Sequence, residues 1–267
     1  MKTLVIKQTL LTCLLFLSCT GLQAQERIVE QPAFDAWSST TLEIDKIALS
    51  DTATVFYIDA YFRPKYWIQV VKETTLRADG KTYPIKAGDG ITLSEKFWMP
   101  ESGEASFRLI FPPLPKGTKT VDFIEGNEEG AFKIWNIHLD GSPANSSLAG
   151  KKNPAETPVL ETPILNSGIA TLKGKIADYK PVFGLDGTSW SYNTLTGGVD
   201  ESHFKIQPDG TFTQEIPLLH ASWIHLATGF INCRVYLKPG EMTSVEINFP
   251  EICRQQSKKQ KDKPSLG

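Results

Sequence analysis

Cysteines are the residues of this sequence with the clearest capacity for chemistry. The sequence contains four cysteines, of which Cys13 and Cys19 lie in its first 24 residues and Cys233 and Cys253 lie near its end. Thiol–disulfide exchange usually needs a second thiol close to the attacking one, and no C-x-x-C occurs. In an oxidising compartment, Cys233 and Cys253 could form a disulfide if the fold brings their Cα atoms within about 7 Å. Otherwise Cys233 is a small buried residue of an expected strand.

Carboxylates and imidazoles are the next candidates for chemistry. Two acids in a cleft could hydrolyse a glycosidic bond, a group of acids could bind calcium, and paired histidines could bind a metal. The sequence shows no H-E-x-x-H and no G-x-S-x-G, so solvated loop acids and isolated histidines are the favoured interpretation. We therefore predict no catalytic residue, no metal site and no cofactor, and an unrecognised hydrolase is the weakest alternative. The residues considered are Asp89, Glu95, Glu101, Glu104, Glu125, Glu128, Glu129, His138, His203, His220 and His225.

One segment combines aromatic and hydrogen-bonding side chains. Residues 184–201, GLDGTSWSYNTLTGGVDE, are interpreted as a loop that offers Trp190 and Tyr192 among Asp, Ser, Asn and Gly. Flat rings beside polar groups suit a sugar ring or a partner surface. They suit a loop packed against a sheet equally well. Trp190 and Tyr192 are therefore the candidate ligand contacts, for a carbohydrate or a peptide.

The first 24 residues predict the compartment. Lys2 and Lys7 precede an apolar run, and small residues lead to Ala24. This order is typical of a cleaved secretory signal, and the run is shorter than the roughly 20 residues of a membrane span. We expect an exported protein of the periplasm or cell envelope without a membrane span. Lipidation at Cys19 is the competing interpretation, and Phe16 and Leu17 fit it poorly.

The charge distribution argues against one class of partner. The chain has 28 basic and 30 acidic residues, and five of the basic ones follow residue 253, so the remainder is acidic on balance. Nucleic-acid binding needs a positive face, and we expect none here. The basic tail, residues 251–267, is expected to be a solvated helix or coil, with contact to an anionic surface as the alternative.

Alternating polarity predicts an all-β chain. Residues 52–62 place Phe56, Ile58, Ala60 and Phe62 on one face, and residues 106–111 alternate in the same way. Residues 67–71 could be a further strand, and an Asp-Gly turn within 76–85 predicts a hairpin. Short strands separated by frequent turns are typical of a β-sandwich. We expect a first sandwich over residues 25–140.

A second module is expected after a change in composition. Residues 141–165 are rich in proline and serine and are interpreted as a linker. Strand patterns resume over 166–250, and HFKIQPDGTFTQEIPL (203–218) predicts two strands paired over an Asp-Gly turn. The predicted fold is therefore two β-sandwich domains, Ig-like or carboxypeptidase-regulatory-like, each with its own core. The sequence leaves open whether they share an interface.

The strand and turn motifs resemble a known family. KTYPIKAGDGI, FRLIFPPLPKGTKTVDFIEG and FKIWNIHL are similar to the first module of exported bacterial thioredoxin-like proteins related to TlpA and the peroxidase-like reductases. DGTF and YLKPGE resemble that family's second module. The resemblance covers residues 40–140 and 166–254. It implies two sandwiches that precede a thioredoxin domain, yet neither that domain nor its C-x-x-C occurs in these 267 residues.

These observations together predict a non-catalytic accessory region. It would position or present a thioredoxin-like redox domain or a partner in the cell envelope, as a truncated product, an expressed fragment or a stand-alone pair of modules. A protein partner or self-association is compatible with this role. A carbohydrate- or peptide-binding protein is the main alternative.

Overall fold

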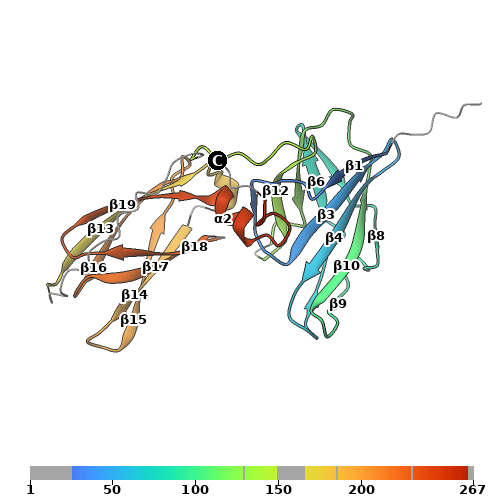
Figure 1. Cartoon of the computed structure of the whole chain (residues 1–267). Coiled ribbons are helices and arrows are strands. Elements are labelled where there is room, and N and C mark those ends of the chain that lie inside the picture. The colour runs from blue at the N-terminus through green and yellow to red at the C-terminus, as the bar shows by residue number, and fades with distance from the viewer. Residues whose placement is uncertain (1–25, 129, 149–165, 185, 230, 264–267) are drawn as a thin grey trace, which may run out of the picture.

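The computed structural model describes residues 26–128, 130–148, 166–184, 186–229 and 231–263. The predicted signal peptide, the lipidation candidate Cys19, Glu129 and residues 149–165 of the predicted linker lie outside these ranges. Within them, no helix has both the length and the apolar character needed to cross a bilayer. Figure 1 shows two β-rich modules with a short helix, α2, between them.

The first module contains two five-stranded sheets. The first sheet, in spatial order, consists of β1 (Arg27–Glu30), β3 (Leu42–Leu49), β4 (Thr54–Tyr61), β10 (Glu104–Phe111) and β8 (Ala87–Asp89). The second consists of β2 (Ala36–Trp37), β12 (Lys133–His138), β11 (Thr120–Ile124), β6 (Thr75–Ala78) and β7 (Lys81–Pro84). A further two-stranded ladder joins β5 (Trp67–Ile68) to β9 (Phe97–Trp98).

Alternation along the strands builds the core between the two sheets. Phe56, Ile58 and Ala60 of β4 are buried, as predicted, whereas Phe62 lies past the end of the strand and is exposed. The ring of Phe56 lies 6.2 Å from that of Phe123 on the opposite sheet. Burial of such side chains stabilises the fold by roughly 1.5–3 kcal/mol each before entropy is counted.

Of two local predictions for this module, the hairpin is confirmed and the strand is shorter than expected. The hairpin around Asp79 and Gly80 is confirmed, and both residues have positive φ, 50° and 72°, as a tight hairpin turn of this kind requires. The strand expected over 67–71 extends only from Trp67 to Ile68.

The second module is also a two-sheet sandwich. Its three-stranded sheet contains β16 (Thr211–Leu218), β13 (Gly168–Ala177) and β19 (Met242–Asn248), with β13 and β19 parallel. Its four-stranded sheet contains β15 (Gly198–Lys205), β14 (Asp186–Asn193), β17 (Ser222–Thr228) and β18 (Ile231–Leu237). The 3₁₀ turn η1 (Pro181–Phe183) and the helix α2 (Phe249–Gln256) complete it. The all-β fold with sandwich layers is thus confirmed.

The segment 203–218 is not a hairpin. Strand β15 pairs with β14 and strand β16 pairs with β13, so the turn at Gly210 carries the chain from one sheet to the other. The side chains predicted to be buried, including Phe204 and Phe212, are buried. An Asp-Gly turn reverses the chain, but it does not determine whether the flanking strands pair or separate into opposing layers.

The predicted loop 184–201 is instead mostly a hairpin. Strands β14 and β15 pair over their full lengths, from Asp186 with Lys205 to Asn193 with Gly198. Trp190 and Tyr192 therefore lie on a strand, two residues apart, and their side chains share the outer face of the sheet. The serines beside the rings were misleading, because Ser189 and Ser191 point inward and are buried.

Candidate functional site

Three carboxylates lie close together on the outer face of the first module. Glu43 of β3 is opposite Asp59 of β4, and Asp45 follows Glu43 on the same side. A bulge between Ile44 and Lys46 shifts the register after this point. We call Glu43, Asp45 and Asp59 the acid row. Neighbouring like charges on a sheet are destabilising, so this row requires a cationic or hydrogen-bond-donating cover.

The segment after α2 provides that cover. The carboxylate of Glu43, only 3% exposed, accepts hydrogen bonds from Ser257 Oγ at 2.9 Å, the Lys258 amide at 2.8 Å and the Lys259 amide at 3.1 Å. A buried carboxylate is stable only when its oxygens are bonded in this way. The chain end of the second module is thus anchored in the first.

Lys259 neutralises the remainder of the acid row. Its Nζ lies 2.8 Å from Asp45 Oδ1 and 2.6 Å from Asp59 Oδ2. Burial by itself would lower the pKa of Lys259, but the hydrogen bonds to both carboxylates outweigh it and raise that pKa. Burial would likewise raise the pKa of Asp59, and the bonds from Lys259 and Ser106 lower it instead. Both groups are therefore charged at neutral pH.

Further polar contacts extend the same junction. Gln260 Nε2 donates to the carbonyl oxygens of Gln31 and Pro32, each at 2.9 Å. Lys258 Nζ lies 3.5 Å from the centre of the Tyr61 ring. Arg254 donates to the carbonyls of the tail itself and so holds the turn after α2 in shape. The tail described through residue 263 is therefore folded and docked, contrary to the expectation of a solvated segment.

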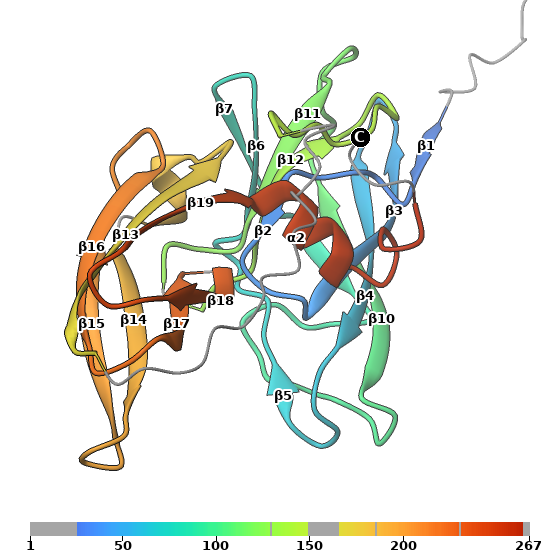
Figure 2. The same cartoon turned by 60° about the vertical axis from the view of Figure 1, so that its left-hand side comes forward.

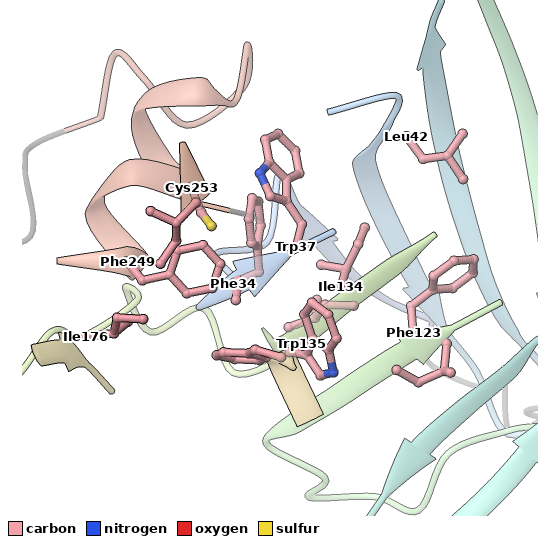
Figure 3. Packing of buried hydrophobic residues seen from close by; sticks show 14 of the residues in the cluster. Phe34, Trp37, Leu42, Phe123, Ile134, Trp135, Ile176, Phe249 and Cys253 are labelled. Atoms are coloured by element: carbon pink, nitrogen blue, oxygen red, sulfur yellow. The ribbon is translucent and has the colours of Figure 1, made fainter. Parts of the chain in front are cut away.

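Apolar side chains join the two cores beneath this polar layer. The Phe183 ring of the second module packs 4.8 Å from Trp135 of the first module and 5.4 Å from Phe249 of α2. Figure 3 shows Phe249 and Cys253 of α2 beside Phe34 and Trp37. The helix itself lies against the first module near β2 and β3 in Figure 2. The modules therefore share an interface, which the sequence left open.

A second surface of interest is the outer face of the four-stranded sheet. Register places Val199 of β15 opposite Tyr192 of β14, and Trp223 of β17 opposite Tyr236 of β18. We call these four residues the aromatic row. Val199, Tyr192 and Trp223 are each more than 60% exposed, and the rings of Trp223 and Tyr236 lie 5.4 Å apart. The row thus presents large apolar groups to solvent.

Polar groups lie directly beside the aromatic row. The adjacent cross-strand line runs through Glu201, Trp190, His225 and Arg234, and we call it the polar row. Trp190 Nε1 donates to Glu201 Oε2 at 2.9 Å, and the Trp190 ring meets that of His225 edge-on at 5.9 Å. Sequence reasoning identified Trp190 and Tyr192 but missed Trp223 and Tyr236, which only strand pairing brings beside them.

Three of the four acids considered for glycoside hydrolysis, Asp89, Glu101 and Glu104, have basic partners instead. Asp89 pairs with Arg108, and Glu101 lies 2.9 Å from Lys65, both at exposed positions. Glu104 lies 3.7 Å from Lys258. Exposed pairs of this kind contribute little to stability and are not the converging acids that glycoside hydrolysis needs.

The calcium and histidine candidates are also dispersed. Glu125 is buried and accepts the amides of Phe132 at 2.8 Å and Val71 at 3.2 Å, so it caps a loop. Burial raises the pKa of Glu125, and these amide bonds oppose that effect. His138 contacts Asp35 and Ser142. No group of three or more potential metal ligands occurs in the described ranges.

Both cysteines of the second module are free thiols, so the disulfide considered from the sequence is not formed. Cys233 lies half-buried on β18, and burial raises the pKa of its thiol. Burial raises the pKa of Cys253, on α2, to about 12. Thiolates are the reactive species, so these are structural thiols at neutral pH.

A surface hollow of the first module offers no acid–base pair of the catalytic kind. It measures about 560 Å³ and lies beside β1 and the 114–118 loop. Its Asp51–Lys116 ion pair, at 2.9 Å, is solvent-exposed. Catalytic groups are usually held in partly buried sites that shift their pKa.

Comparisons with known proteins add little to this geometry. No protein-family model and no curated protein matches the chain. Two solved structures share weak similarity: the Bacillus anthracis TIE protein, with 9% identity and a TM-score of 0.19, and the Corynebacterium diphtheriae major pilin SpaA, with 8% identity and a TM-score of 0.19. The alignments cover 86% and 84% of this chain, and 41% and 68% of those chains.

Proposed function

We propose that this chain is a non-catalytic, exported accessory protein whose two sandwich modules act as one rigid body that positions a partner in the cell envelope. The thioredoxin-like redox domain implied by the sequence resemblance is one such partner. The observation that carries the proposal is the anchoring of Ser257, Lys258 and Lys259 on the acid row. A segment from the second module that satisfies buried charges of the first fixes the angle between them.

Small-angle X-ray scattering of purified residues 25–267 tests the rigid body. The expected curve is that of a single compact two-module particle. Lys259→Met should loosen the junction and so raise the radius of gyration, because Asp45 and Asp59 lose their common counter-ion. Glu95→Gln, which changes an exposed loop acid of the same module, is the control and should leave the curve unchanged. A wild-type curve that requires freely moving modules would contradict the proposal.

Two further measurements address catalysis and export. An insulin-reduction assay should give no turnover, since Cys253 is buried and, among the residues that the structure describes, no second thiol lies beside Cys233. Robust reduction that Cys233→Ser abolishes would show that the protein is an enzyme. Expression in a bacterial host should release a periplasmic protein that begins at Gln25. Retention of Met1 in the cytosol would refute the export proposal.

Ligand binding by the second module is a second candidate function. The aromatic row favours it, because contiguous exposed apolar groups on a monomer commonly mark a binding surface. Carbohydrates and peptides are the two ligand classes considered from the sequence. This candidate is compatible with the first, since a rigid two-module body can also present a binding face.

A further inference from the structure

The aromatic row is a line of apolar side chains on the outer face of the sheet, in which the rings of Trp223 and Tyr236 are tilted by 57° to each other. Val199 pairs with Tyr192 and Trp223 pairs with Tyr236, and the pairing of β14 with β17 ends at Trp190 and His225, two residues short of Tyr192 and Trp223. Because strands are spaced by 4.7–4.9 Å, a row across four strands spans about 14 Å. The rings of Tyr192, Trp223 and Tyr236 stand on paired strands rather than on loops. Such rings lose little freedom on binding a ligand, which favours affinity.

Charge selects among the ligands that this face could bind. Glu201 is engaged by Trp190 and by His203, whose Nε2 lies 3.3 Å from Glu201 Oε1, and Arg234 lies on the same row. The polar row therefore carries one acidic side chain, Glu201, and one basic side chain, Arg234, beside the neutral rings of the aromatic row. This balance contrasts with the acidic character of the rest of the mature chain. An uncharged ligand matches it better than a polyanion or polycation does.

Backbone pairing argues against a peptide ligand at this face. Peptides commonly add as a strand to an open sheet edge, where unpaired N–H and C=O groups bind them. The rings of Tyr192 and Trp223 project from β14 and β17, the two inner strands of the sheet, and not from the edge strands β15 and β18. A ligand above these strands meets side chains, not free backbone groups.

We infer that the outer face of the four-stranded sheet binds an extended, uncharged glycan. The apolar faces of successive sugar rings would lie on Tyr192, Trp223 and Tyr236, since aromatic rings present a flat apolar surface. Glu201, His225 and Arg234 would bond the hydroxyl groups along one side, as the few polar groups of such sites do. This inference rests on the second proposed function, ligand binding.

Isothermal titration calorimetry of purified residues 25–267 tests the inference. The probes are cellohexaose and mannohexaose as neutral glycans, polygalacturonate as an anionic glycan and a random octapeptide mixture. At least one neutral hexaose should bind, and Trp223→Ala should weaken it at least tenfold. Trp98→Ala is the matched control, because Trp98 on the first module is 62% exposed and Trp223 is 63% exposed. This control should bind like the wild type.

The other outcomes separate the inference from the proposed function. Binding of peptides or polygalacturonate alone would overturn the neutral-glycan assignment and retain ligand binding. Equal losses in Trp98→Ala and Trp223→Ala would place binding elsewhere and overturn the inference. No binding by any probe would overturn both the inference and the second function. Circular dichroism of each variant checks that it is folded, and Tyr192→Phe, which keeps the ring, should retain binding.

Discussion

The carboxylate of Glu43 and the hydroxyl of Ser257 form a 2.9 Å hydrogen bond across 214 positions of sequence. This contact joins a strand of the first module to the turn that follows the last helix of the second. Glu43 also accepts two backbone amides from that turn. The segment that follows α2 therefore packs against β3, near the start of the described chain.

Glu43→Gln should destabilise this junction strongly. The amide NH₂ would face donors, and one of the three hydrogen bonds to the buried oxygens would be lost. We expect a loss of about 2–4 kcal/mol in the free energy of unfolding, measured by urea denaturation. Glu95→Gln should change it by less than about 0.5 kcal/mol. An equal effect of the two substitutions would contradict the assigned role of Glu43.

Removal of the charge on Lys259 should destabilise the fold, because this charge neutralises the acid row. Lys259→Met leaves Asp45 and Asp59 without their shared cation, and we expect a cost of about 2–3 kcal/mol, below the full value for a buried pair because Asp45 is partly exposed. The double variant Lys259→Met/Asp59→Asn should recover part of this loss, as a double-mutant cycle would show. Additive effects would mean that the two side chains do not interact.

The stability of the junction should fall both at acid pH and at strongly alkaline pH. The pKa of Asp59 in the folded protein lies below the ordinary aspartate value of about 3.9. Its contribution is therefore present above that value and is lost as the pH falls through the lower folded pKa. The raised pKa of Lys259 gives a contribution that is complete below about pH 10 and is lost at higher pH.

Urea midpoints measured between pH 2 and 11 would test this profile. We expect a plateau from about pH 5 to 9 for this pair, with a decline on either side. Asp59→Asn should make the acid decline shallower. An unchanged acid slope in that variant would show that other carboxylates account for the decline.

A side chain at either of two glycines should destabilise the fold, because each glycine lies under an aromatic ring. A Cβ at Gly187 would lie 2.2 Å from Phe204 Cζ, and one at Gly174 would lie 2.0 Å from Phe212 Cζ. The two rings stack at 4.7 Å between the sheets. Gly187→Ala should cost about 1–3 kcal/mol, measured by thermal unfolding. Phe204→Leu in the same chain should restore part of it, and absence of any rescue would point to another cause.

The two thiols should be unreactive in the folded protein. Burial raises both pKa values, to about 12 for Cys253, so little thiolate forms at pH 8. We expect slow or no reaction with Ellman's reagent before denaturation and two thiols afterward. A purified protein with no titratable thiol in denaturant would show that the pair forms a disulfide.

The strand positions and much of the core could be predicted from the sequence alone. Alternation places Phe56, Ile58, Phe107 and Leu109 inward whatever their partners, because the side-chain period of a strand is two. The Asp79–Gly80 turn was equally readable, since positive φ at both positions strongly favours these residue types. Such features depend on neighbours within about ten residues.

Only the tertiary structure decided which strands pair and what covers the surfaces. Asp209-Gly210 looks locally like Asp79-Gly80, yet one turn joins paired strands and the other joins opposing sheets. The aromatic row and the cover of Glu43 likewise combine residues far apart in the chain. Pairing and docking depend on the total free energy of long-range contacts, which no local window of sequence contains.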